Sequence, residues 1–208
     1  MSLAKRLARG VLHGIQASVE HIFGSPDLDG RSVLVQGVGA VGHDLARQLA
    51  EAGARVLVAD VDEERAGRVA TEIGGELIPA NDALTTECDV YAPCAIGGTL
   101  SAETIPTLGC RIVAGSANNQ LVEPEDAARL HAAVILYAPD YVINAGGVLQ
   151  LAGLANLGWD EAELERNLAG IGDTLRGLYR DADASGITPS EAAERLAAAR
   201  VAAALSST

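Results

Sequence analysis

Apolar residues recur every three to four positions along the first part of the chain, which is the spacing of a helix with one buried face. Turn-forming residues over 24–30 then end this pattern. Gly10 and Gly14 lie near the apolar stripe and would let another element approach closely. The sequence therefore predicts an amphipathic helix over residues 1–23, with a stripe of Leu3, Leu7, Val11, Ile15, Val19 and Ile22.

Short β-branched runs then alternate with helical patterns. Residues 32–36 and 55–60 predict two buried strands, separated by a helix, and another helix is expected over 62–73. Three further strand candidates follow, at 89–92, 111–114 and 133–137. Because strands alternate with helices, we expect an α/β fold with a doubly wound, mostly parallel sheet and extra helices at both ends.

The last part of the chain is helical in pattern. One long stripe consists of Leu164, Leu168, Ile171, Leu175 and Leu178. A final helix is expected to start with Thr188 as its N-cap, Pro189 in its first position and Glu191 completing a capping box. We expect a single domain over 1–208, divided into an N-terminal helix at 1–23, a strand–helix core at 31–150 and C-terminal helices at 151–208.

Composition narrows the possible functions. Hydrophobic residues make up 49% of the chain, which is enough for a core, and the net charge of −13 disfavours binding to nucleic acid or to anionic membranes. No apolar run approaches the roughly 18 residues of a membrane span. The three cysteines include no Cys-x-x-Cys pair, so we expect neither disulfides nor a metal site. This cysteine usage fits a reducing compartment, and we expect a cytoplasmic location.

A glycine-rich segment follows the first predicted strand and opens the next helix. It reads Gly37-Val38-Gly39-Ala40-Val41-Gly42. Gly37 would allow the tight turn, Gly39 would let the backbone approach a pyrophosphate, and Gly42 would let helix and strand pack closely. Asp60 ends the second strand about 20 residues later, where a carboxylate binds ribose hydroxyls and repels a 2′-phosphate. The pattern predicts a Rossmann-type dinucleotide site that prefers NAD over NADP.

Arg65 lies near this acid on the helix predicted over 62–73. It could in principle help to bind a 2′-phosphate. Because the same helix carries Asp62, Glu63 and Glu64, we interpret Arg65 as a surface ion-pair partner.

Three more segments with glycine and polar side chains follow later strand candidates, at 92–98, 114–120 and 138–148. In an open parallel sheet, ligands bind beyond the carboxyl ends of the strands, so these segments would line one crevice. Amide side chains there can both donate to and accept from a nicotinamide carboxamide without adding charge.

These segments, together with the glycine loop and Asp60, resemble the NAD-binding domain of the Glu/Leu/Phe/Val amino-acid dehydrogenase superfamily. The strings Gly-Ser-Ala-Asn-Asn-Gln at 115–120 and Pro-Asp-Tyr-Val-Ile-Asn-Ala-Gly-Gly at 139–147 indicate its leucine/phenylalanine/valine branch. The resemblance implies NAD-dependent oxidative deamination of a branched-chain or aromatic L-amino acid to the 2-oxo acid, with hydride passing to C4 of the nicotinamide.

The resemblance also implies roles for particular residues. Gly37, Gly39 and Gly42 would hold the pyrophosphate, and Asp60 the adenosine ribose. Ala95 and Gly97 would border the nicotinamide ribose, while Asn118 and Asn144 would flank the nicotinamide and the substrate. Val142 would supply part of an apolar wall around the substrate side chain. We expect neighbouring residues to touch the same cofactor, namely Ala40, Val41, Val61, Cys94 and Ala117.

Two departures from the family matter. Its catalytic lysine and aspartate lie in a separate N-terminal domain, and the only lysine here is Lys5, in a terminal helix. Relatives open this domain with Thr-Ala-(Arg/Lys)-Gly, whereas this chain has Leu7-Ala8-Arg9-Gly10. We therefore expect no catalytic residue in this chain. We expect its partner to be the missing catalytic domain or a partner chain. We also expect a homo-oligomer, with part of the helical stripes covered by that missing domain.

Three functions remain open at this stage. The first is the cofactor half of an amino-acid dehydrogenase, which would be inactive alone. The second is a stand-alone NAD-binding or sensing module. The third is an intact small dehydrogenase of another type, which needs an internal acid or base. The candidates for that role are His13, His21, His43 and His131.

Overall fold

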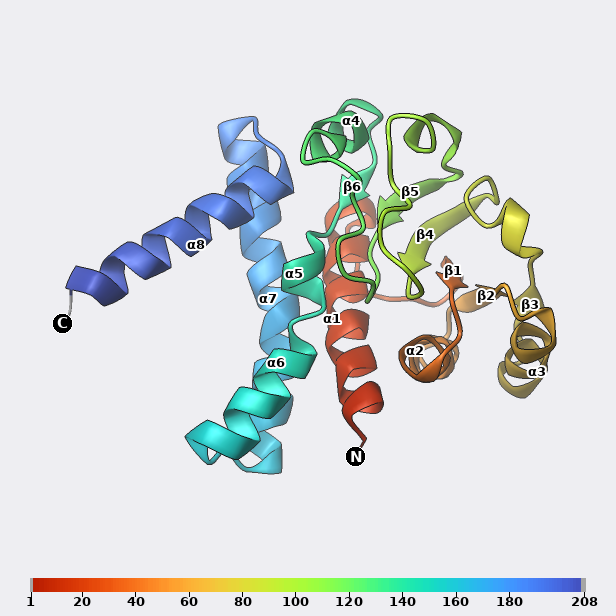
Figure 1. Ribbon diagram of the computed structural model, residues 1–208, viewed down its shortest axis with the longest axis horizontal. Coiled ribbons are helices and arrows are strands. Elements are labelled where there is room, and N and C mark those ends of the chain that lie inside the picture. Colours follow the sequence, from red (N-terminus) through yellow and green to blue (C-terminus); the bar gives the residue numbers. More distant parts are fainter. Residues whose placement is uncertain (1, 207–208) are drawn as a thin grey trace.

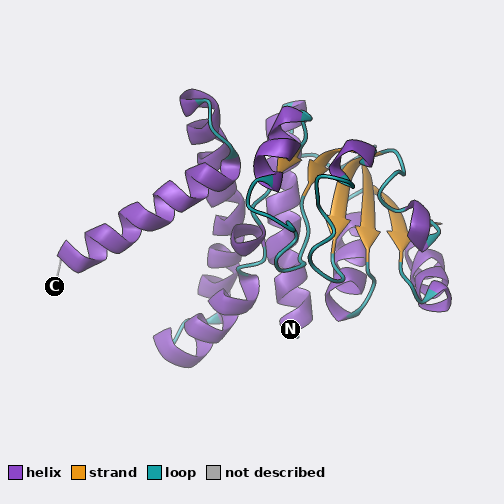
Figure 2. Ribbon diagram, turned by 45° about the horizontal axis from the view of Figure 1, so that its top comes forward, coloured by secondary structure: helices purple, strands orange, loops and turns teal. Residues whose placement is uncertain are grey.

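Six parallel strands form the central sheet of the computed structural model, which describes residues 2–206 (Figure 2). They lie in the order β3-β2-β1-β4-β5-β6, the strand order of the Rossmann fold. Their bounds are β1 Ser32–Gln36, β2 Arg55–Ala59, β3 Glu76–Leu77, β4 Cys88–Pro93, β5 Cys110–Val113 and β6 Leu136–Tyr137. Every pair of neighbours is parallel, which confirms the predicted doubly wound sheet.

Helices surround this sheet and extend beyond it (Figure 1). The α-helices are α1 Leu3–Phe23, α2 Ala40–Glu51, α3 Glu63–Ile73, α4 Asp126–Ala132, α5 Asp140–Ile143, α6 Gly146–Gln150, α7 Glu161–Ser185 and α8 Pro189–Ser206. Two 3-10 turns, η1 Ala80–Asp82 and η2 Ile105–Thr107, and a π-helical segment, η3 Leu151–Leu157, complete the list. Among residues 2–206, no helix is long and apolar enough to cross a membrane.

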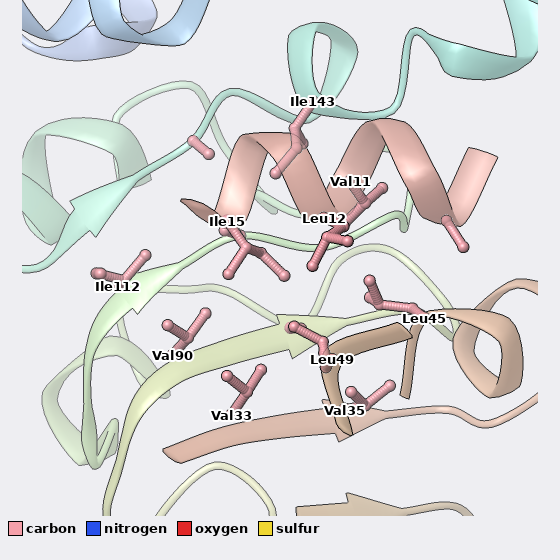
Figure 3. Packing of buried hydrophobic residues seen from close by; sticks show 14 of the residues in the cluster. Val11, Leu12, Ile15, Val33, Val35, Leu45, Leu49, Val90, Ile112 and Ile143 are labelled. Carbon is pink, nitrogen blue, oxygen red and sulfur yellow. The ribbon is translucent and has the colours of Figure 1, made fainter. Parts of the chain in front are cut away.

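The sheet is buried on both faces, because successive side chains of a strand point to opposite sides. Val33 and Val35 of β1 face one core, beneath α1 and α2 (Figure 3). Leu34 and Tyr91 face a second core, which includes Leu130 of α4. Burial on both sides explains why the strand segments are continuously apolar instead of alternating.

Helix α1 lies between the sheet and α7, and its predicted stripe packs inside the domain (Figure 1). Val11 and Ile15 are fully buried, and so are Leu168 and Leu175 of α7. The expectation that a missing domain covers part of these stripes is therefore wrong at these four positions; Leu3, at the start of α1, is 44% exposed.

Small residues allow this close packing, as predicted. A Cβ atom at Gly14 would lie 2.5 Å from Cγ1 of Ile143, and one at Gly10 would lie 2.7 Å from Cδ1 of Ile171. Real Cβ atoms essentially never approach a heavy atom this closely, so glycine at these positions allows α1 to pack tightly against α5 and α7.

The strand predicted at 133–137 is shorter in the structure. Ala133 caps the end of α4, and Val134 has a φ of 60° and is 84% exposed. Ile135 closes this turn by donating its N–H to the carbonyl of Leu130, so only Leu136 and Tyr137 pair with β5. A tight turn at the helix end thus overrides the β-branched run.

The start of α8 matches its predicted capping box. The N–H of Glu191 donates to Oγ1 of Thr188, and the Glu191 carboxylate accepts from the N–H of Thr188 at 2.7 Å. Beyond this first part, α8 projects away from the body of the molecule (Figures 1 and 2). Val201 and Leu205 on this projecting part are 60% and 75% exposed.

Candidate cofactor site

The glycine loop joins the end of β1 to the start of α2. Gly37 has a φ of 91°, and a Cβ there would lie 2.5 Å from that of Ala95. At Gly42, a Cβ would lie 1.9 Å from the carbonyl oxygen of Gly37, so only glycine fits in the first turn of α2. Gly39 differs from both, because no heavy atom lies within 4 Å of the space that its Cβ would take. The loop therefore presents open backbone at Gly39.

The N-terminus of α2 is free to receive an anion. Gly39 is its N-cap residue, and no side chain caps the first turn. Gly39 and Ala40 are exposed, and Val41 is partly exposed. The unpaired N–H groups and the positive end of the helix dipole favour a phosphate at this position. This cradle fits the pyrophosphate of a dinucleotide.

Asp60 holds the glycine loop from the end of β2. Its side chain is buried, and Oδ2 accepts the N–H of Val38 at 2.8 Å while Oδ1 accepts the N–H of Asp62 at 3.0 Å. The guanidinium of Arg65 donates to Oδ1 at 2.7 Å. Burial alone raises the pKa of Asp60, but the hydrogen bonds from Arg65, Asp62 and Val38 outweigh it, so this pKa lies below its ordinary value. The carboxylate is ionised at neutral pH.

A hollow of about 450 Å³ opens beside the loop, between α2 and α3. Two arginines, one histidine and one acid lie on its walls, together with the loop backbone. The pair His43 and Glu72 closes one side, with Nε2 of the histidine 2.9 Å from Oε2 of the glutamate. The lining residues are Val38, Gly39, Ala40, His43, Arg65, Arg68, Val69 and Glu72.

The other predicted segments meet at the carboxyl ends of β4, β5 and β6. Nδ2 of Asn144 donates to Oδ1 of Asn118, which joins the segments after β5 and β6. The N–H of Ala117 donates to the carbonyl of Pro93 at 2.9 Å, and a Cβ on Gly97 would lie 2.2 Å from the carbonyl oxygen of Asn118. The structure thus brings these segments to the same sheet edge.

Exposed apolar side chains flank the polar edge. Val61 follows Asp60 and is 89% exposed, and Ile96 follows the exposed Ala95 and is 74% exposed. Cys94 packs against the core instead, and burial raises the pKa of its thiol. It is therefore a small apolar residue beneath the loop and not a reactive nucleophile.

Some residues named from the sequence do not join this edge. Val142 lines a separate groove of about 460 Å³ formed with α7 and α8, a groove that neither Asn118 nor Asn144 lines. Lys5 lies in α1 and His131 in α4, and neither lines the hollow beside the glycine loop. Within residues 2–206, no cluster of three or more His, Cys, Asp or Glu side chains is arranged to hold a metal ion.

Two important contacts were not found from the sequence. Arg65 pairs with buried Asp60 and, at 3.5 Å, with Asp62, so it is more than the surface partner expected on an acidic helix. Gln120 is fully buried and donates to the carbonyls of Gly115 and Ala117, which fixes the loop that carries Asn118. Both contacts join residues at most five positions apart, but they depend on side-chain conformations that the hydrophobic pattern does not encode.

Comparison with known proteins places this geometry in context. Leucine dehydrogenase of Geobacillus stearothermophilus is 40% identical over 194 residues, which is 93% of this chain and 53% of that protein. Valine dehydrogenase of Streptomyces virginiae is 43% identical over 197 residues, 93% of this chain and 55% of that protein. The chain thus spans about half the length of these relatives.

Solved structures agree with the sequence comparison. The crystal structure of L-tryptophan dehydrogenase from Nostoc punctiforme superimposes with a TM-score of 0.92 at 39% identity, covering 97% of this chain and 61% of that one. The family model of the Glutamate/Leucine/Phenylalanine/Valine dehydrogenases matches residues 58–208. This chain belongs to the Glutamate/Leucine/Phenylalanine/Valine dehydrogenase family.

Proposed function

We propose that this chain binds NAD⁺ along the carboxyl edge of its sheet. The observation that carries the proposal is the hydrogen bond between Asp60 and the glycine loop. The carboxylate that would bind the ribose accepts the N–H of Val38, which lies beside the open backbone of Gly39. The pyrophosphate would lie on the uncapped N-terminus of α2, held by backbone N–H groups of Ala40, Val41 and Gly42.

The two ends of the cofactor would meet different surfaces. Val61, which is exposed beside Asp60, offers an apolar surface for the adenosine. Ala95 and Gly97 would border the nicotinamide ribose, above the partly buried Cys94. The amide pair of Asn118 and Asn144, next to Ala117, would orient the nicotinamide carboxamide without adding charge.

We further propose that the chain is the cofactor half of an L-amino-acid dehydrogenase. Bound NAD⁺ would accept a hydride at C4 of its nicotinamide, from a branched-chain or aromatic amino acid. The relatives named above act on leucine, valine and tryptophan, as their names state. The general acid–base residues would come from a catalytic domain or partner chain, in a cytoplasmic enzyme. The alternative is a stand-alone NAD-binding or sensing module.

Calorimetry and a turnover assay test this proposal together. We expect NAD⁺ and NADH to bind weakly, because half of the cleft belongs to the partner, and NADP⁺ to bind at least about tenfold more weakly. We expect no NADH to form with leucine, valine, phenylalanine or tryptophan. Absence of NAD⁺ binding would overturn the cofactor site, and deamination by the purified 208-residue chain would overturn its assignment as an inactive half.

A further inference from the structure

The carboxylate of Asp60 has few acceptor positions left for a ribose. An ionised carboxylate accepts about four hydrogen bonds, two on each oxygen. Oδ1 already accepts from Arg65 at 2.7 Å and from the N–H of Asp62 at 3.0 Å, while Oδ2 accepts from the N–H of Val38. One position on Oδ2 remains. One ribose hydroxyl can therefore donate to Asp60 while Arg65 stays in place, and a second could do so only after Arg65 leaves Oδ1.

Arg65 is the partner that can move. Asp62 and Val38 donate through their backbone, which the loop and helix fix in place, whereas Arg65 donates from a long side chain that is 41% exposed. Its Nε is buried and has no hydrogen-bond partner within the described structure. A new anionic acceptor would satisfy that donor.

The surroundings of Arg65 also suit an additional anion. Arg65 lines the hollow beside the exposed backbone of Gly39 and Ala40. Arg68, one turn further along α3, lines the same hollow and pairs with the exposed Glu64. The group that would extend from the ribose here in NADP is the 2′-phosphate, and a guanidinium binds phosphate through two parallel N–H groups.

We propose that Arg65 is a specificity-determining residue that reduces the preference for NAD over NADP. It neutralises Asp60 when the ribose carries a hydroxyl, and it turns to the phosphate when the ribose carries one. Asp60 alone would exclude a 2′-phosphate strongly, so the pair gives a chain that prefers NAD and still tolerates NADP. This inference rests on the proposed function, because it assigns a residue of the same cofactor site.

Binding constants for NAD⁺ and NADP⁺ test the proposal, with 5′-AMP and 2′,5′-ADP as probes of the adenosine half alone. In Arg65→Ala and in Arg65→Gln, we expect NADP⁺ to bind about tenfold more weakly, while the affinity for NAD⁺ changes by less than about threefold. In Asp60→Ala, the freed arginine should bring the two affinities together or reverse their order. The double variant should lose that gain.

Arg129→Ala is the matched control. Arg129 also donates at 2.7 Å to a buried aspartate, Asp126, and is 39% exposed, but it lies in α4 and not in the hollow. Its removal should leave the ratio of the two affinities unchanged. If Arg65→Ala and Arg65→Gln behave like this control, the inference is wrong although NAD⁺ still binds. If the unmodified chain binds neither dinucleotide, the inference is overturned together with the proposed cofactor site.

Discussion

The N–H of Val38 donates to Oδ2 of Asp60 at 2.8 Å, and this contact joins the glycine loop to the end of β2. The residue that would recognise the ribose therefore also fixes the loop that would hold the pyrophosphate. Its carboxylate is buried and accepts two further hydrogen bonds on Oδ1. Changes at Asp60 should for this reason affect stability as well as cofactor choice.

Replacement of Asp60 by asparagine should destabilise the fold in a pH-dependent way. We expect Asp60→Asn to lower the free energy of unfolding at pH 7 by about 1–3 kcal/mol, the usual effect of weakening a buried charge-assisted network. The folded-state pKa of Asp60 is depressed, so its contribution is present above the unfolded pKa of about 3.9 and is lost as the pH falls through the folded value. Urea unfolding at pH 7 and at pH 3 measures this, and an equal difference at both values would contradict it.

Two alanine substitutions in the glycine loop should affect different properties: Gly42→Ala should lower stability, and Gly39→Ala should lower NAD⁺ affinity. Gly42→Ala places a methyl group 1.9 Å from the carbonyl oxygen of Gly37, so we expect a loss of about 1–3 kcal/mol or more in stability. Gly39→Ala meets no atom within 4 Å and has an ordinary φ of −68°, so its stability should change by less than about 0.5 kcal/mol. Its methyl group would occupy the space where the pyrophosphate approaches, and NAD⁺ affinity should fall at least about tenfold.

Gly177→Ala in α7 serves as the control for Gly39→Ala, because a Cβ there also meets nothing within 4 Å. We expect it to raise the melting temperature slightly, as alanine does in a helix interior, and to leave NAD⁺ affinity unchanged. Thermal melts and calorimetry on the three variants give both quantities. Unchanged NAD⁺ affinity in a folded Gly39→Ala would remove this loop from the proposed site.

The strand–helix alternation and the glycine loop could be predicted because local chemistry decides them. Gly37 has the positive φ that its motif requires, and Asp60 stands at the end of β2 at the predicted spacing. The two-residue strand β3, Glu76–Leu77, could not be predicted, since it is short, exposed and not β-branched. It exists because β2 offers it a free edge.

Contacts between distant segments were beyond the sequence pattern. The stripes of α1 and α7 indicated which faces are buried, but not that they are buried against each other. The pair of Arg65 and Asp60 is close in sequence, yet the periodicity of α3 gave no sign that this guanidinium turns back to the end of β2. These relationships follow from how the helices fold back on the sheet, and only the structure shows them.

A buried hydroxyl pair links α1 to α7 and should respond unequally to substitution. Oγ of Ser18 and the hydroxyl of Tyr179 lie 2.7 Å apart, and Ser18 also donates to the carbonyl of Gly14 at 2.8 Å, so Tyr179 is the donor in the pair. Tyr179→Phe should cost about 0.5–1.5 kcal/mol. Ser18→Ala should cost more, about 1–3 kcal/mol, because it leaves the tyrosine donor buried and unsatisfied. Chemical unfolding of both variants decides the order, and equal or reversed losses would contradict this assignment.

The cysteines should be unreactive in the folded chain. Burial raises the pKa of the Cys88 and Cys110 thiols to about 12, and it also raises that of Cys94, so almost no thiolate forms at pH 8. Iodoacetamide at that pH should label the protein slowly in buffer and rapidly in urea, with mass spectrometry assigning the sites. Fast native labelling at Cys94 would show that the segment after β4 opens readily.

The helical layer should behave as part of the domain's own core. Leu175 of α7 is fully buried, so Leu175→Ala should cost about 2–5 kcal/mol, whereas Val201→Ala on the projecting part of α8 should change stability by less than about 0.5 kcal/mol. Hydrogen exchange should show α1 and α7 protected to the same degree as β1 and β4, since Ile15 lies with Val33 and Val90 (Figure 3) in a cluster that also includes Leu175. Association between copies stays a prediction. If copies associate, we expect hydrogen exchange at the exposed Val201 and Leu205 of α8 to slow as the protein concentration rises. Rapid exchange of α1 at all concentrations, or a negligible loss in Leu175→Ala, would show that these helices are not part of a core that this chain forms by itself.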